Sequence, residues 1–93
     1  NADGFNQDLN SWNTSNALNM SDMFGSTAIF NGNITGWSTS NVTDMGAMFA
    51  NAVSFNKDLS SWVVNPNVTD CANFDTGATA WVLSRPNFTS CTI

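Results

Sequence analysis

The side chains in this sequence that could carry out acid–base or nucleophilic chemistry are few. All seven acidic residues are aspartate, Lys57 and Arg85 are the only basic residues, and histidine and glutamate are absent. Catalytic triads and acid–base pairs draw mainly on the residue types that are missing. Asp44 and Asp70 occupy equivalent places and offer paired carboxylates, but a capping role explains them without catalysis. We therefore predict that the chain is not an enzyme and has no catalytic residues.

Metal-ligating patterns are equally sparse. Cys71 and Cys91 lie 20 residues apart in a chain without histidine, which is not the pattern of a zinc site. Asp8 and Asp58 recur in the same turn of the pattern with Asn33 between them, and these oxygens could form a weak calcium ladder. No loop carries aspartate at alternate positions as calcium loops do, so turn chemistry is the favoured explanation. We predict neither a metal nor a cofactor.

Charge and composition limit the partners. A net charge of −5 argues against nucleic acid and against anionic membrane surfaces. No apolar run approaches the ~18 residues of a membrane span, so membrane insertion is not expected. Asparagine, serine and threonine supply 36 of 93 residues, which suits an extracellular or cell-surface repeat built from turns and polar ladders. The expected partners are proteins or further copies of the chain.

N-glycosylation is a further candidate chemistry. Asn19 is expected to cap a helix, where a glycan would not fit, whereas Asn33 and Asn87 lie near turns and are the better candidates if the source glycosylates secreted proteins. The alternative is that Asn-Val-Thr is simply the sequence that a strand requires here. The sequons start at Asn13, Asn19, Asn33, Asn41, Asn67 and Asn87.

Two aromatic series recur along the chain. Phe5, Phe30 and Phe55 are 25 residues apart, and Trp12, Trp37 and Trp62 keep the same spacing. Tryptophan rows could stack on carbohydrate, but many phenylalanines without tyrosine favour a core role. The threonine rows are incomplete (Thr14, Thr39, then Val64), so an ice-binding face remains a minor alternative.

The period of 25 residues identifies the elements that must position these side chains. A fixed repeat of this length predicts a solenoid, in which each unit buries its apolar face against its neighbours. The coils span residues 5–29, 30–54 and 55–80, with an insertion near Asn65–Pro66, and residues 81–93 form a partial coil or cap. We predict one repeat domain over residues 1–93.

Spacing within each coil predicts short helices and strands. Met45, Met48 and Phe49 fall at i, i+3 and i+4, as on the inward face of a helical turn, and Met20, Met23 and Phe24 do the same. The residue just before each of these turns is an expected helix cap, and so is the equivalent residue of the third coil. The expected caps are Asn19, Asp44 and Asp70. Segments 41–43 and 67–69 are expected to be short parallel strands, ~4.8 Å apart in the stack. The predicted core rows contain Phe5, Phe30, Phe55, Trp12, Trp37, Trp62, Met20, Met45, Met23, Met48 and Phe74.

The repeat unit resembles a known family. Its three versions read FNQDLNSWNTSNALNMSDMF, FNGNITGWSTSNVTDMGAMFANA and FNKDLSSWVVNPNVTDCANF. They are similar to the BspA-like leucine-rich-repeat surface proteins over residues 5 to about 80. The resemblance implies a secreted or cell-surface leucine-rich-like solenoid used in adhesion and protein interaction, and no shared catalytic residues. Together these arguments predict an α/β solenoid, a right-handed coil of about 3.5 turns.

The two cysteines and the first coil bear on assembly. In strict register Cys91 would lie roughly 17 Å from Cys71, whereas a disulfide needs Cα atoms within about 7 Å. An internal bond therefore requires the tail to leave register and cover the last coil; otherwise each cysteine pairs with another subunit. The first coil starts at Phe5, with no room before it for a capping repeat. We predict an adhesion or protein-interaction module; the alternative is a self-assembling subunit of an extracellular filament, formed by end-to-end stacking of solenoids.

Overall fold

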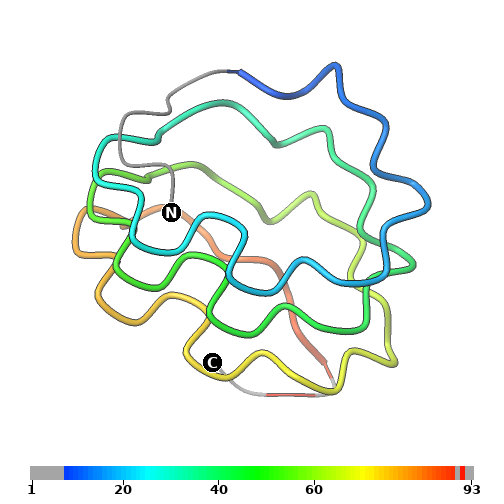
Figure 1. The fold of residues 1–93 in the computed structure, drawn as a ribbon. Helices are drawn as coiled ribbons and strands as arrows, with labels where there is room; N and C mark the ends of the chain where they lie inside the picture. The colour runs from blue at the N-terminus through cyan, green and yellow to red at the C-terminus, as the bar shows by residue number, and fades with distance from the viewer. Residues whose placement is uncertain (1–7, 90, 92–93) are drawn as a thin grey trace.

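Three repeats of the chain lie one above another in the computed structural model, which describes residues 8–89 and 91 (Figure 1). Backbone amides of one repeat donate to carbonyl groups of the next, about one repeat further along the chain. Three of these bonds are Leu9 N to Asn33 O (3.0 Å), Met20 N to Asp44 O (2.9 Å) and Met45 N to Asp70 O (2.8 Å). The stack measures 32 × 27 × 22 Å along its principal axes.

The predicted helices and strands do not form. Among the residues that the structure describes there is no helix and no strand, only isolated parallel bridges that pair Asn19 with Asp44 and Asp44 with Asp70. The prediction of an α/β, leucine-rich-repeat-like solenoid, with strands at 41–43 and 67–69 and helical turns at 20–24 and 45–49, is therefore wrong. The repeats instead form a compact body of turns and irregular segments.

Hydrogen bonding in residues 45–52 explains why no helix forms there. Every second amide bonds inside the segment, to the carbonyl three residues earlier: Met48 N to Met45 O, Ala50 N to Ala47 O and Ala52 N to Phe49 O. The intervening amides of residues 45, 47, 49 and 51 donate to carbonyls of residues 70, 72, 74 and 76 in the next repeat. A helix would satisfy every amide within the segment and leave none for the neighbour. Alternating turns therefore replace the helix.

The backbone conformation follows the same alternation between bonds within the segment and bonds to the next repeat. Residues with positive φ recur at two equivalent places in each repeat: Asp22, Ala47 and Asn73 at the first, and Ser26, Asn51 and Gly77 at the second. Such left-handed residues cannot continue a right-handed helix, and they cost ~1–2 kcal/mol each unless the residue is glycine or a short polar one. Bonds between repeats stabilise this conformation.

The core consists of columns of like side chains that run through the stack. Trp37 stacks on Trp62 with ring centroids 6.5 Å apart, and Phe30 stacks on Phe55 at 5.7 Å. The other buried members of the predicted rows are Met20, Met45, Met48 and Phe74. Phe5 lies outside the described residues.

Polar groups also connect the repeats. The indole N–H groups of Trp37 and Trp62 donate to the carbonyls of Leu9 (2.8 Å) and Ile34 (3.0 Å). The side-chain oxygen of Asn31 accepts the amide of Asn56 at 2.8 Å. Every buried side-chain nitrogen or oxygen within the described part has a partner. Because no neighbouring strand pairs with these backbone groups, indole and amide side chains satisfy them instead.

Candidate interaction surface

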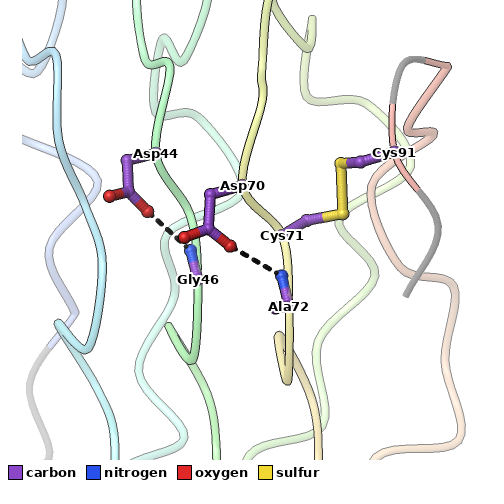
Figure 2. The surroundings of a disulfide bond; sticks show 6 residues. All are labelled: Asp44, Gly46, Asp70, Cys71, Ala72 and Cys91. Atoms are coloured by element: carbon purple, nitrogen blue, oxygen red, sulfur yellow. Dashed lines mark hydrogen bonds between the residues drawn. A yellow bond between two sulfur atoms is a disulfide. The ribbon is translucent and has the colours of Figure 1, made fainter.

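The predicted helix caps close turns instead. The Oδ1 atoms of Asn19, Asp44 and Asp70 accept the amide two residues further on, at 2.8, 3.0 and 3.0 Å. Figure 2 shows the bonds of Asp44 and Asp70. With no helix to cap, the helix-cap assignment is wrong. These are Asx turns, in which a short polar side chain replaces a backbone acceptor. Both carboxylates are thereby held by backbone structure.

The remaining candidate carboxylate ligands also accept backbone amides, Asp8 from the next repeat and Asp58 within a turn. Asp8 accepts the amide of Asn33 at 2.9 Å. Asp58 accepts the hydroxyl of Ser60 at 2.6 Å and its amide at 2.9 Å, and these two bonds lower the pKa of Asp58 below its ordinary value. Within the described residues no three potential metal ligands of the types Asp, Glu, His and Cys gather, and no pocket opens.

The two glycosylation candidates differ in their surroundings. The side-chain oxygen of Asn33 accepts the hydroxyl and the amide of Thr35, at 2.8 and 3.1 Å, and Asn33 is half-buried. Asn87 is exposed. Modification at these positions stays a prediction.

The two ends of the stack differ in how they expose the core. Trp12 is 55% exposed, whereas Trp62, its equivalent two repeats later, is 4% exposed. Met23 is 43% exposed, whereas its equivalent Phe74 is fully buried. The prediction that Trp12 and Met23 belong to the core is therefore wrong. Their rows are inward-facing, but no described residue covers them at this end.

The first repeat, which carries these two side chains, also has backbone acceptors that no described residue uses. Carbonyls of residues 44, 46, 48 and 50 accept amides of the repeat before them. The equivalent carbonyls of Asn19, Ser21, Met23 and Gly25 receive no hydrogen bond from any described residue. We call the side chains of Trp12 and Met23, together with these four carbonyls, the open face. It combines apolar surface with a row of hydrogen-bond acceptors, as an uncovered sheet edge does.

The opposite end is covered in part by residues 85–89 and 91. Cys91 forms a disulfide with Cys71, with Cα atoms 6.3 Å apart (Figure 2). The Phe88 ring lies edge-on against Phe74, with centroids 5.1 Å apart. Near this contact the Nε of Arg85 donates to Asp75 at 2.9 Å. The segment has left the repeat register, which brings Cys91 much closer to Cys71 than strict register allows. We call residues 85–89 and 91 the tail, and the surface of the third repeat that it contacts the covered face.

The covered face carries the complementary backbone groups. Amides of residues 45, 47, 49 and 51 donate to the third repeat. The equivalent amides of Cys71, Asn73, Asp75 and Gly77 donate to no described residue. Counting hydrogen bonds among the described residues, one face of the stack therefore has four open acceptors and the other has four open donors, of which those of Cys71 and Asp75 belong to residues that the tail contacts.

Reasoning from the sequence did not identify the ion pair that helps to hold the tail. Asp75 stands where the first two repeats have Phe24 and Phe49, and ten residues later comes the only arginine. A carboxylate in an aromatic row is the signal that could have revealed the contact, because a charge there needs a partner.

Comparison with known proteins gives one match. The family model described as "Mycoplasma protein of unknown function, DUF285" matches residues 1–85. No curated protein and no solved structure matches the chain significantly. None of the described residues forms a helix with the length and hydropathy needed to cross a bilayer.

Proposed function

This chain belongs to the family described as Mycoplasma protein of unknown function, DUF285, and we propose that it is a non-enzymatic protein-interaction module that acts outside the cell. The observation that carries this proposal is the open face. Exposed apolar side chains next to unpaired backbone groups are typical of surfaces that bind other polypeptides.

Two further observations support the proposal. A disulfide joins Cys71 to Cys91, and such bonds form and persist mainly in oxidising compartments. The repeats also resemble those of BspA-like surface proteins, whose family role is adhesion. The finer proposal is therefore that the bound partners are proteins met at the cell surface.

The open face fits a partner that supplies backbone donors and an apolar side chain. An extended segment could donate amides to the carbonyls of Ser21 and Met23 while it buries the exposed parts of Met23 and Trp12. In such strand addition the main-chain bonds give affinity and the side-chain pockets give specificity. The filament subunit, the alternative function, also needs the second end to be accessible, and the tail covers that end in the disulfide-bonded chain.

The test compares two double variants of the disulfide-bonded chain. Trp12→Ser/Met23→Ser alters the open face, and Val63→Ser/Val82→Ser removes two side chains that are also exposed but belong to the third repeat and the segment after it. Binding is measured by surface plasmon resonance to immobilised laminin, collagen, mucin and the chain itself.

We expect binding to at least one of these proteins and at least a tenfold loss, equivalent to about 1.4 kcal/mol, for the open-face variant alone. Equal losses in both variants would show that the open face is not the binding surface. No binding to any of the immobilised proteins would contradict the interaction function.

A further inference from the structure

We infer that Asp75 and Arg85 are specificity-determining residues: they place an ion pair in two rows that are otherwise apolar, and so prevent a further repeat from packing on the third one. The excluded repeat can belong to the same polypeptide or to another. The pair has this effect whatever segments precede or follow it. The inference goes beyond the proposed function, which concerns the open face, because it limits what can bind at the other end of the stack.

Asp75 occupies a row of buried aromatic side chains. Phe24, Phe49 and Asp75 are equivalent, because the carbonyl of each accepts the amide three residues further on. Phe24 and Phe49 are buried and stack on each other, with ring centroids 5.5 Å apart. A row that gains a stacked ring from one repeat to the next is therefore interrupted by a carboxylate in the third repeat.

Arg85 follows a row of buried aliphatic side chains. The amide of Leu59 donates to the carbonyl of Ser84 at 2.9 Å, which repeats the bond from Leu9 to the second repeat. The chain is therefore in register at Ser84, and Arg85 takes the next place. In the earlier repeats this place is held by Leu9, Ile34 and Leu59, which are all buried.

The two charged side chains meet beside the last ring of the aromatic core. The Nε of Arg85 donates to Oδ2 of Asp75 at 2.9 Å, and the two side chains are 30% and 25% exposed. The guanidinium carbon lies 4.7 Å from the centroid of the Trp81 ring. Trp81 takes the place of Phe30 and Phe55, and its ring lies edge-on against Phe55 with centroids 4.8 Å apart. The aromatic column thus ends next to a cation and its counter-ion.

Partial exposure to water makes the pair inexpensive in this position, since such pairs change stability little. A further repeat in register would cover the pair with the counterparts of Phe49 and Leu59. Both charges would lose hydration, and mutual attraction offsets that loss only where further hydrogen bonds satisfy the two groups. Apolar side chains supply no such bonds. Between the earlier repeats the same step buries apolar surface against apolar surface, which is favourable.

The alternative is a purely local role, in which the pair only attaches Arg85 and its neighbours to the third repeat. Removal of the pair would then lower stability whether or not a repeat lies over it. The two roles therefore predict opposite effects of the same substitution once a further repeat covers the pair.

Two insertions of identical composition provide the test. A second copy of residues 35–59, one full repeat, is inserted after Arg85, where it would cover the pair, or after Leu59, where it would lie between apolar rows. Both chains are unfolded in urea with dithiothreitol present, because the first insertion separates Cys91 from Cys71. We expect the midpoint of the first chain to lie about 1 M below that of the second.

Asp75→Phe/Arg85→Leu restores the residue types of the earlier repeats and is made in both chains. It should raise the midpoint of the first chain by about 1 M. In the second chain it should lower the midpoint or leave it unchanged, because no further repeat lies over the pair there. Hydrogen exchange followed by intact mass should show additional protected amides in the first chain after the substitution, as the inserted repeat packs.

Equal midpoints for the two insertions would overturn the inference. A double substitution that lowers both midpoints would leave only the local role, and one that raises both equally would show that apolar residues at these positions are favourable without a covering repeat. Either result would also overturn the inference. Trp12 and Met23 are unchanged in every chain, and binding to matrix proteins is measured separately, so the proposed function can stand when this inference fails.

Discussion

Replacing Trp37 with alanine should cost much more stability than the same change at Trp12, although both occupy the same place in consecutive repeats. Trp37 is 4% exposed and stacks between Trp12 and Trp62, with ring centroids 6.1 and 6.5 Å away. Its indole N–H donates to the carbonyl of Leu9 at 2.8 Å. Trp12 is 55% exposed and has Trp37 as its stacking partner.

The structure sets the size of each effect. Truncating a buried tryptophan to alanine costs about 3–5 kcal/mol, and at Trp37 this includes two stacked pairs worth about 0.5–1.5 kcal/mol each and a hydrogen bond worth about 1 kcal/mol. At Trp12 we expect about 1–2 kcal/mol, because one stacked pair is lost and water fills the space. A small domain has only about 5–15 kcal/mol of stability in total, so Trp37→Ala should leave it barely folded.

Differential scanning calorimetry is the appropriate assay, because each variant removes one of the four tryptophans on which fluorescence would depend. A difference of about 2 kcal/mol between the variants should separate their melting temperatures by about 8–16 °C. Trp37→Phe is the control: it keeps an aromatic ring but loses the N–H donor, and should melt between wild type and Trp37→Ala. Equal losses at Trp12 and Trp37 would refute the conclusion that the first tryptophan lies on an uncovered face.

Three further predictions concern turns. Gly77→Ala should lower the free energy of unfolding by about 1–3 kcal/mol, because φ is +78° and the new Cβ would collide with Oδ1 of Asn51; an unchanged urea midpoint would contradict this. Ala47→Gly should raise it by about 0.5–1 kcal/mol, since glycine accepts a φ of 54° without strain; a lower urea midpoint would count against that account. In an NMR titration Asp58 should show a pKa below its ordinary value. Ser60→Ala should raise this pKa, because the hydrogen bond from the Ser60 hydroxyl is the main cause of the lowering. A carboxylate whose pKa falls on folding stabilises the fold above its unfolded-state pKa, and this stabilisation is lost as pH drops through the folded-state value; an unaltered midpoint in Ser60→Ala would refute the assigned cause.

Spacing alone identifies many buried side chains. Phe30 and Phe55, or Trp37 and Trp62, recur at one period with residue types that prefer the interior, and they are buried. The period also places equivalent residues side by side, as the bonds from one repeat to the next show. These properties depend only on which side chains must avoid water and how often they recur.

Local conformation could not be predicted in the same way. Met45, Met48 and Phe49 point inward at helical spacing, but consecutive turns with a left-handed residue between them also put these side chains on one face. Ala47 has the highest intrinsic helix propensity of any residue type, and yet it has positive φ. Bonding to the neighbouring repeat outweighs this local preference, and that bonding is a property of the stack.

The difference in exposure between the two ends of the stack also could not be predicted from the sequence. Trp12 and Trp62 are the same residue at the same position, and their exposures differ because of what lies above and below them. The tail covers the third repeat only by leaving the periodic register, so the period could not place Cys91 beside Cys71. The spacing of the cysteines left both an internal bond and an intermolecular bond open.

The alternating bonds of the turn segments give the stack an electrical direction. The amides of residues 20, 22, 24 and 26 donate to the second repeat, and those of residues 45, 47, 49 and 51 donate to the third, so both sets point toward the higher-numbered repeat. Their peptide dipoles therefore add along the stack, as they do along a helix axis. The carbonyl row at residues 19–25 is the partially negative pole of this array, and the amide row at residues 71–77 is the positive one. The chain thus presents a field of fixed polarity that would orient an approaching polar partner before any contact forms.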